Sequence, residues 1–455
     1  MPSCDVLVAG AGLAGLTTAL AAADGGASVW LVAKGHAATH WSHGGLDLAA
    51  PPGTVGGGEG VALLARRPGH PYEIVAEDLP AGLARVRRAL DAAGLAYEGD
   101  LASPHGRIPT AVGATRPAGV LPGAQAAARA PWRPGEGLLV VGFERFRDFA
   151  APAVAASLAR PLPWAGAPRP ERVTAVGVTL PGLAERRNLD GLDLARAFDD
   201  PSWRGPALDA IARAVEPHRG DGELRVAFPA VLGLADHPAV AAALDARLGG
   251  PWFEIPLVPP SVPGLRLYEA MVAALRAARV AVQVGFAVSA AIRTPDGRVA
   301  GLATAAAGRP FPIRAGQVVL ATGGFASGGL VATADGRVEE PILGLPVEAP
   351  PQPAWLAPSM FDPAGHPLEA AGIRTDRKLR PVGPTGERAE RGVRIAGALL
   401  AGARALRERS GDGIAIASGE RAARLALART VGALAVPSGP VAAGPAAGPE
   451  GRGAR

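Results

Sequence analysis

Residues 4–34, which read CDVLVAGAGLAGLTTALAAADGGASVWLVAK, decide the expected fold of this chain. An apolar run is followed by a glycine-rich turn, an alanine-rich helical stretch and a second apolar run. This order predicts a strand, a helix and a parallel strand, and the continuous apolar character of the first strand predicts a sheet covered on both faces. Gly25 and Gly26 stand where the helix is expected to end. The stretch therefore predicts an α/β fold that opens with a βαβ unit.

Gly10, Gly12 and Gly15 form a G-x-G-x-x-G motif between the first strand and the helix. The first glycine allows the tight turn, the second lets a phosphate approach the backbone, and the third allows close packing of helix on strand. The free amides of the first helical turn, at Leu13 and Ala14, and the helix dipole favour an anion here. The motif predicts a Rossmann-like FAD/NAD(P)-binding domain with a parallel sheet. A Rossmann-like unit that has lost its ligand is the alternative.

The second strand ends on Ala33 and Lys34, where a ribose-binding acid is expected about 20 residues after the glycines. Asp24 lies in the helix-to-strand turn and is expected to face away. Loss of one charge-assisted hydrogen bond costs roughly 1.5–3 kcal/mol, which weakens binding of the adenosine ribose but not of phosphate. NAD is therefore disfavoured, although Lys34 could reach the 2′-phosphate of NADP. A flavin fits better, and FMN, which has no adenosine ribose, is the first choice, with FAD as the alternative.

Three later glycine turns resemble those of two-dinucleotide-fold flavoproteins of the fumarate reductase type. They are the loop HAATHWSHGGLDLA (36–49), the turn ATGG (321–324) after an apolar strand, and SGDG (410–413) at the expected start of a helix. In such proteins that helix directs its positive end at the flavin ring and stabilises a reduced, anionic ring. The cofactor contacts predicted from these turns are Ser42, Gly44, Gly45, Ala321, Thr322, Gly323, Gly324, Gly411 and Gly413. Gly397, at the end of the strand expected before the last turn, is predicted as a further contact.

The rhythm of strands and helices divides the chain into two expected domains. A discontinuous flavin-binding domain is predicted over residues 1–100 plus 263–436. A second α/β rhythm predicts an inserted domain over residues 101–262. Residues 437–455, SGPVAAGPAAGPEGRGAR after Pro437, are low in complexity and are expected to be disordered.

Composition narrows the class of protein. The chain has 455 residues, a formal net charge of +5 and one cysteine, Cys4, which is expected to be a buried strand thiol. One cysteine cannot hold an iron–sulfur cluster, no metal-binding spacing is present, and any iron–sulfur cluster must come from a partner. No dense basic cluster with interleaved aromatic residues is present, so no nucleic acid is expected as a partner. Neither a transmembrane run nor a signal peptide is expected.

Segments outside the general flavin pattern are similar to the B subunits of the anaerobic glycerol-3-phosphate dehydrogenase family. The similarity extends to about residue 430 and includes the run EEPILGL. The segments that carry it are HAATHWSHGGLDL (36–48), IPTAVGATRPAGVLPG (108–123), IPLVPPSVPGLRLYEAM (255–271), GFASGGLVATADGRVEEPILGLPV (324–347) and MFDPAGHPLEAAGIRTDRKLRP (360–381).

The resemblance implies a three-subunit respiratory enzyme that oxidises sn-glycerol 3-phosphate to dihydroxyacetone phosphate. In that family the catalytic A subunit holds FAD and pairs with the B subunit, which is usually assigned FMN. The C subunit holds iron–sulfur clusters, attaches the complex to the inner face of the cytoplasmic membrane and passes electrons to quinone. The resemblance therefore implies a peripheral protein held at that face by its partners.

Oxidation of an alcohol by a flavin needs a base for the hydroxyl proton, and a phosphate substrate needs an arginine fork. His40 and His43 are the candidate bases, and Arg116 and Arg266 are the candidate phosphate ligands, with solvated or structural roles as the alternatives. A further expectation is that the A subunit performs the hydride step and the B subunit relays electrons. The rival classes are a stand-alone flavin oxidoreductase acting on another small acid and a flavin-free scaffold for the FAD-bearing partner.

Overall fold

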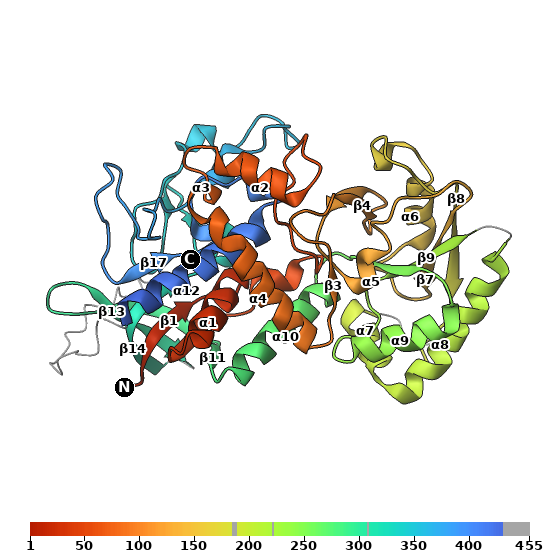
Figure 1. Cartoon of the computed structure of the whole chain (residues 1–455), viewed down its shortest axis with the longest axis horizontal. Coiled ribbons are helices and arrows are strands. Elements are labelled where there is room, and N and C mark those ends of the chain that lie inside the picture. The colour runs from red at the N-terminus through yellow and green to blue at the C-terminus, as the bar shows by residue number, and fades with distance from the viewer. Residues whose placement is uncertain (184–188, 221–222, 307–308, 431–455) are drawn as a thin grey trace, which may run out of the picture.

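The computed structural model describes residues 1–430 apart from 184–188, 221–222 and 307–308. The predicted disordered tail, 437–455, lies outside the described residues. The chain forms two α/β bodies, each built on its own sheet (Figure 1). Two separate clusters of buried hydrophobic side chains match the two sheets.

The larger sheet grows outward from the N-terminal strand β1 (Ser3–Ala9), whose Val6, Leu7 and Val8 are fully buried. Its order is β11-β2-β1-β14-β13-β12, and β17 also pairs with β14. Strands β11, β2, β1, β14 and β17 are parallel, whereas β12 and β13 form an antiparallel extension. The bounds are β2 Val29–Ala33, β11 Ala281–Val284, β12 Ala287–Arg293, β13 Val299–Ala306, β14 Arg309–Leu320 and β17 Val393–Ile395. The predicted Rossmann-like parallel sheet is confirmed.

Two long helices lie side by side against this sheet, α1 (Leu13–Asp24) and α12 (Gly411–Thr430) (Figure 1). Gly419 makes their contact close, because a Cβ there would lie 2.6 Å from the carbonyl oxygen of Ala14. One helix length further on, Gly25 meets Leu427, so the two helices run in the same direction. Measured from these two contacts, α12 begins four to seven residues beyond the start of α1, which is roughly 6–10 Å at 1.5 Å per residue.

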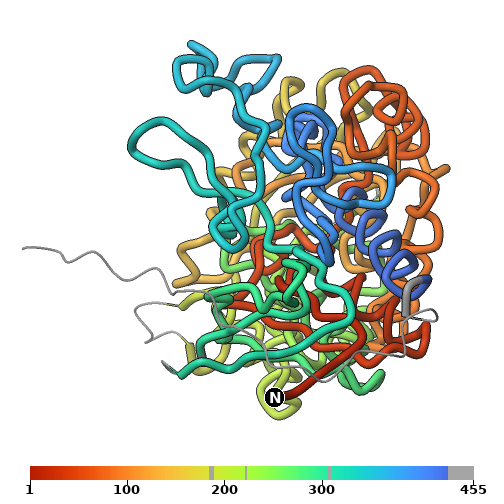
Figure 2. Tube along the Cα trace, turned by 90° about the vertical axis from the view of Figure 1, so that its left-hand side faces the viewer, coloured from red at the N-terminus to blue at the C-terminus, as the bar shows by residue number. Residues whose placement is uncertain are grey.

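Helices α4 (Leu79–Ala92) and α10 (Val262–Ala277) complete this helical layer. The shorter helices α2 (Gly57–Ala65), α3 (Tyr72–Val75) and α11 (Ala405–Glu408) lie nearer the start of α12. The long loops between β14 and β17 contain the short hairpin of β15 (Val331–Ala332) and β16 (Val338–Glu339) together with single 3-10 turns. Figure 2 shows these loops, in cyan, projecting from the sheet.

The inserted α/β body has a four-stranded parallel sheet in the order β10-β9-β7-β8. Its core includes the fully buried rings of Phe198, Phe228 and Phe253. Its elements are β7 Gly137–Phe143, α6 Ala151–Leu158, β8 Arg172–Val178, α7 Gly191–Asp199, α8 Pro201–Val215, β9 Leu224–Pro229, α9 His237–Leu248 and β10 Trp252–Ile255. An inserted α/β domain is thereby confirmed, while the boundaries 101 and 262 stay predictions.

Small elements join the two bodies. Two short antiparallel pairs and one helical turn lie between α4 and β7. They are β3 Tyr97–Glu98, β4 Gly106–Pro109, β5 Thr115–Ala118, β6 Leu121–Pro122 and α5 Gly123–Ala126. Single 3-10 turns are η1 Ala38–Trp41, η2 Ala76–Asp78, η3 Leu162–Trp164, η4 Glu216–His218, η5 Phe325–Ser327, η6 Gln352–Ala354, η7 Pro367–Ala370 and η8 Gly397–Leu399.

The substitution Gly10→Ala is expected to lower the free energy of unfolding by about 2–4 kcal/mol. Gly10 has a φ of +116°, and an added Cβ would overlap the carbonyl of Ala321 and lie 3.1 Å from the amide nitrogen of Thr322. Urea denaturation followed by circular dichroism measures the effect. Gly35→Ala is the matched control, because nothing lies within 4 Å of a Cβ there. Equal stability of the two variants would contradict the close approach.

Candidate flavin site and its charged cluster

The first turn of α1 presents free backbone amides. Gly12 is its N-cap, and in the described part of the chain no side chain caps the helix and no acidic residue lies in its first turn. A Cβ on Gly12 would meet only the Cβ of Ala37, at 3.8 Å, so the backbone of this turn is open. Gly15 is tightly packed instead, since a Cβ there would overlap the carbonyl of Gly10. The turn, including Leu13 and Ala14, can therefore hold an anion such as a phosphate.

No carboxylate lies at the end of β2. Ala33 is buried, and its carbonyl accepts hydrogen bonds of 2.9 Å from the amides of Gly285 and Phe286. Lys34 is exposed. Asp24 forms an ion pair with Arg85 of α4 and is not directed at the end of β2. The site thus lacks the acid that holds an adenosine ribose in dinucleotide-binding proteins.

The turn after β14 and the turn after β17 both meet the start of α1. The amide of Ala321 donates to the carbonyl of Ala9 (2.8 Å), and Gly323 has a φ of +80°. Gly397 has a φ of +73°, donates its amide to Ser418 Oγ (2.8 Å) and approaches the Cβ of Ala14.

Two groups in these turns are open to a ligand. The hydroxyl of Thr322 is buried and has no hydrogen-bond partner among the described residues. At Gly324 a Cβ would find only the carbonyl of Ala398, at 3.5 Å. These features fit a phosphate-bearing cofactor that lies along the turns.

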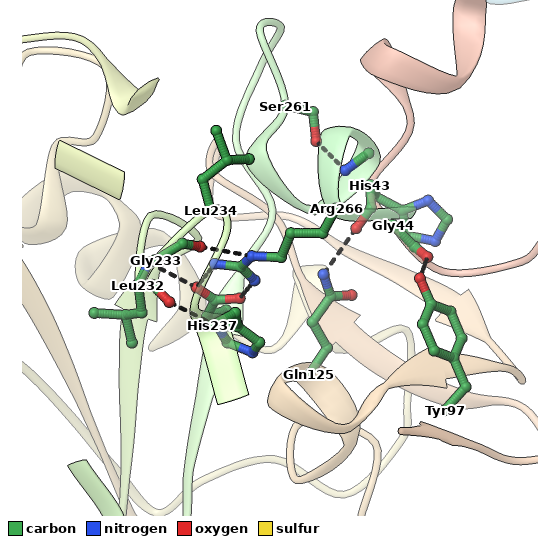
Figure 3. Close-up of polar contacts among 12 residues, drawn as sticks. His43, Gly44, Tyr97, Gln125, Leu232, Gly233, Leu234, His237, Ser261 and Arg266 are labelled. Atoms are coloured by element: carbon green, nitrogen blue, oxygen red, sulfur yellow. Dashed lines mark hydrogen bonds and ion pairs between the residues drawn. The ribbon is translucent and has the colours of Figure 1, made fainter. Parts of the chain in front are cut away.

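The loop that contains Ser42, Gly44 and Gly45 is fixed between α10 and the inserted body (Figure 3). The hydroxyl of Tyr97 donates to the carbonyl of Gly44 (2.6 Å), and Gln125 Nε2 donates to the carbonyl of His43 (2.7 Å). The amide of Gly44 donates to Ser42 Oγ (3.3 Å). Gly45 needs to be glycine, because a Cβ there would lie 2.7 Å from His43 Nε2.

The loop continues to the start of α12. A Cβ on Gly413 would lie 2.6 Å from the carbonyl of Leu48, and its amide donates to the carbonyl of Asp47 (3.0 Å). Gly411 is less crowded, because a Cβ there would lie 3.6 Å from the Cβ of Ala405. The loop after β2 therefore covers the N-terminus of α12.

At that junction five ionisable side chains form what we name the charged cluster: His43, Asp47, Arg116, Arg409 and Asp412. The amide of Asp47 donates to Asp412 Oδ2 (2.9 Å), and Arg116 Nη2 donates to Asp47 Oδ1 (2.6 Å). His43 Nε2 lies 3.9 Å from Asp47 Oδ1. His43 Nε2 and Arg116 Nε are buried and lack a hydrogen-bond partner among the described residues.

The environment shifts the proton affinity of this cluster. Burial, and then the nearby charge of Asp47, raise the pKa of Asp412 to about 7. Burial, and then the charge of Arg116, lower the pKa of His43 to about 4, although Asp47 opposes that change. Burial, and then Arg116, also lower the pKa of Arg409. At neutral pH His43 is therefore uncharged, whereas Asp412 is divided between its two forms.

His40 lies outside the charged cluster. Its ring packs edge-on against Tyr268 of α10, with ring centroids 4.2 Å apart. Burial, and then the neighbouring His36, lower the pKa of His40 to about 4. Its role as a base stays a prediction.

Arg266 forms a buried ion pair within the protein (Figure 3). Nη1 and Nη2 donate to the carboxylate of Glu254 (2.6 and 3.0 Å), and Nε donates to the carbonyl of Gly233 (2.7 Å). Both side chains of the pair are buried. Three of the five N–H groups of Arg266 are therefore used to join α10 to the inserted body. This buried ion pair favours a structural role, and a role in binding substrate phosphate stays a prediction.

Three members of the charged cluster were not predicted as site residues: Asp47, Arg409 and Asp412. Asp47 and Asp412 lie 365 positions apart, and only the folded chain brings them together. A signal for Asp412 existed, because it stands inside the turn 410–413 that predicted a helix start. Arg409 directly precedes that turn.

Fold and site together define a flavoprotein of the α/β class. The chain matches the family model described as FAD binding domain over residues 5–414, and it belongs to that family. The match supports a flavin of the FAD type and gives no support to FMN.

Relatives narrow this assignment further. The chain is 35% identical over 432 residues to the probable B subunit of anaerobic glycerol-3-phosphate dehydrogenase from Halobacterium salinarum, a match that covers 91% of this chain and 96% of that protein. It is 33% identical over 433 residues to the B subunit of the Yersinia pestis enzyme, with the same coverage. The B subunit of the Vibrio cholerae enzyme is 30% identical over 451 residues, 93% of this chain and 96% of that protein. The chain is therefore a member of the family formed by the B subunits of anaerobic glycerol-3-phosphate dehydrogenase.

Across the described residues, no helix has both the length and the apolar character needed to cross a membrane. Within the same part of the chain, no group of three or more His, Cys, Asp and Glu side chains is arranged to hold a metal ion.

The substitution Arg266→Ala is expected to lower the free energy of unfolding by about 3–5 kcal/mol, because it leaves the carboxylate of Glu254 buried without its cation. Urea denaturation followed by tryptophan fluorescence measures this loss. The control is Arg133→Ala, which breaks the exposed pair with Glu223 and should change stability little. A stable Arg266→Ala protein that has lost glycerol 3-phosphate binding would instead support Arg266 as a substrate ligand.

Proposed function

We propose that this chain is the flavin-bearing B subunit of a respiratory enzyme that oxidises sn-glycerol 3-phosphate to dihydroxyacetone phosphate. The observation that carries the proposal is the convergence of Arg116 and Arg409 at the N-terminus of α12. Among the described residues, Asp47 is the only carboxylate bonded to Arg116, and the guanidinium of Arg409 has no hydrogen-bond partner. Two arginines with unused donors beside a helix N-terminus suit a phosphate dianion.

The cofactor is proposed to be a flavin whose phosphate lies on the amides of α1. Since α12 begins roughly 6–10 Å beyond α1, the ring end of the molecule would reach the start of α12 and the charged cluster. The absence of a carboxylate after β2 favours FMN, whereas the FAD-type family favours FAD. We propose FMN, with FAD as the alternative that the experiment below decides.

The bound flavin supplies the acceptor for two electrons. The residues of the chain then have separate tasks. Asp47 holds Arg116 in place through its carboxylate and leaves Arg116 Nε free. Arg116 and Arg409 bind the phosphate and orient the substrate carbon that carries the hydroxyl. His43 is uncharged at neutral pH, so it adds no positive charge beside Arg116 and Arg409.

The partners are proposed from the family. An FAD-containing A subunit would pair with this chain, and an iron–sulfur C subunit would attach the pair to the cytoplasmic face of the membrane and reduce quinone. The two rival functions are a stand-alone flavin oxidoreductase of another small acid and a flavin-free scaffold. They predict a different flavin content of the purified chain, or a different response of its flavin to sn-glycerol 3-phosphate.

The first test is the colour and cofactor of the chain purified with and without its partner subunits. The expected result is a flavin absorbance spectrum, bleached by sn-glycerol 3-phosphate in the assembled complex. The mass of the released cofactor separates FMN from FAD. A colourless chain in both preparations would support the scaffold, and a flavin that sn-glycerol 3-phosphate leaves oxidised in the complex would support the stand-alone oxidoreductase.

The second test is the substitution Arg409→Gln, which is expected to weaken binding of glycerol 3-phosphate to the chain roughly 10- to 100-fold, as for a lost charge-assisted hydrogen bond. Calorimetric titration measures the binding constant. Arg407→Gln is the matched control, because this arginine lies in the same turn but donates to the carbonyl of Pro363 instead. If the unsubstituted chain binds no glycerol 3-phosphate, it relays electrons without contacting substrate.

A further inference from the structure

Within the described part of the chain, Asp412 is the carboxyl group of the charged cluster that has no cationic hydrogen-bond partner of its own. It lies in the first turn of α12, and its carboxylate accepts the amide of Asp47. The carboxylate of Asp47 is itself bonded to Arg116. Two carboxyl groups therefore share one neighbouring arginine, and the second of them is left without a counter-ion.

From this geometry we propose that Asp412 takes up a proton when the flavin bound at this site is reduced. The inference rests on the proposed function for the presence of a flavin. It adds that the N-terminus of α12 carries a proton-binding group coupled to the electrons on the ring.

The groups around Asp412 belong to several elements. The loop after β2 brings Asp47 and His43, the strand β5 brings Arg116, and the turn before α12 brings Glu408 and Arg409. Two buried tyrosines, Tyr72 of α3 and Tyr97 of β3, also sense the charge of Asp412, which raises the pKa of each. Burial is the larger cause for both tyrosines, so they stay protonated and uncharged. Near neutral pH, Asp412 is the member of this set that changes charge.

The direction of the coupling follows from electrostatics. With the ring oxidised, the pKa of Asp412 is about 7, so its carboxyl is mostly ionised above that pH. A ring that has gained two electrons and one proton is anionic, and a like charge nearby raises the pKa of a carboxyl. At a pH between the pKa of Asp412 with the ring oxidised and its higher pKa with the ring reduced, reduction of the ring is accompanied by protonation of Asp412.

The atoms and electrons balance for an alcohol substrate. The C–H bond breaks and both its electrons pass with the hydrogen to the flavin, while the O–H bond breaks and a C=O bond forms. Two electrons and two protons leave the alcohol. One proton stays on the ring, and the other is the equivalent of the proton that Asp412 takes up.

The experiment is a spectroelectrochemical titration of the flavin-loaded protein between about pH 7.5 and about pH 9, with no substrate present. Each proton taken up with two electrons changes the midpoint potential by about 30 mV per pH unit. The unsubstituted protein is expected to show twice the slope of Asp412→Asn. Glu420→Gln is the control, because Glu420 lies on the same helix but pairs with Arg85 two turns further on.

A second variant keeps the test independent of how well Asp412→Asn folds. Asp47→Asn removes the carboxylate next to Asp412 and should move the steep part of the slope to lower pH. Three results would overturn the inference. The first is an equal slope of midpoint potential against pH in the unsubstituted protein and Asp412→Asn, and the second is loss of the steep slope in Glu420→Gln. The third is a steep region that stays at the same pH in Asp47→Asn. Such results on a yellow, reducible protein leave the proposed function standing, whereas a protein that binds no flavin beside its partners overturns both.

Discussion

The whole site depends on the close backbone contact between the start of α1 and the strands on either side of it. Gly10 and Gly15 let the first turn of α1 lie directly on the β1–α1 turn, and Gly419 lets α12 pack on the same helix. These contacts leave no space for a Cβ, and no side chain among the described residues caps the amides at the start of α1. The same contacts fix the offset between the starts of α1 and α12, and hence the distance between the free amides of α1 and the charged cluster.

Much of the fold could be predicted because its signals are local. The βαβ opening, the turn after β14 and the helix at Gly411 each depend on a few adjacent residues, and each lies where the pattern indicated. Arg266 shows what local patterns leave out. Its ion-pair partner, Glu254, lies on a strand of the inserted body and is buried with it. The sequence does not display this burial or this pairing, so it could not weigh a structural role for Arg266 against a role as a ligand.

The charged cluster also depends on contacts between residues that are distant in the sequence. Arg116 was predicted from its segment, yet its geometry depends on Asp47, and Asp47 in turn on the backbone of α12. The small elements that join the two bodies hold the loop after β2 in place, since Gln125 and Tyr97 donate hydrogen bonds to the carbonyls of His43 and Gly44. A site assembled from four distant segments cannot be read from any one of them.

The distribution of charge in the cluster also explains why a carboxyl, rather than a histidine, responds to the ring. Burial disfavours a charge on His43, and the two arginines that suit a phosphate oppose a third cation beside them. The same burial makes Asp412 hold its proton more tightly, and Asp47 adds to this effect. The arginines proposed to bind substrate therefore lower the pKa of the nearby imidazole, while the carboxylate that holds Arg116 raises the pKa of Asp412. The proposed substrate binding and the proposed proton uptake would thus both follow from a single arrangement of charges.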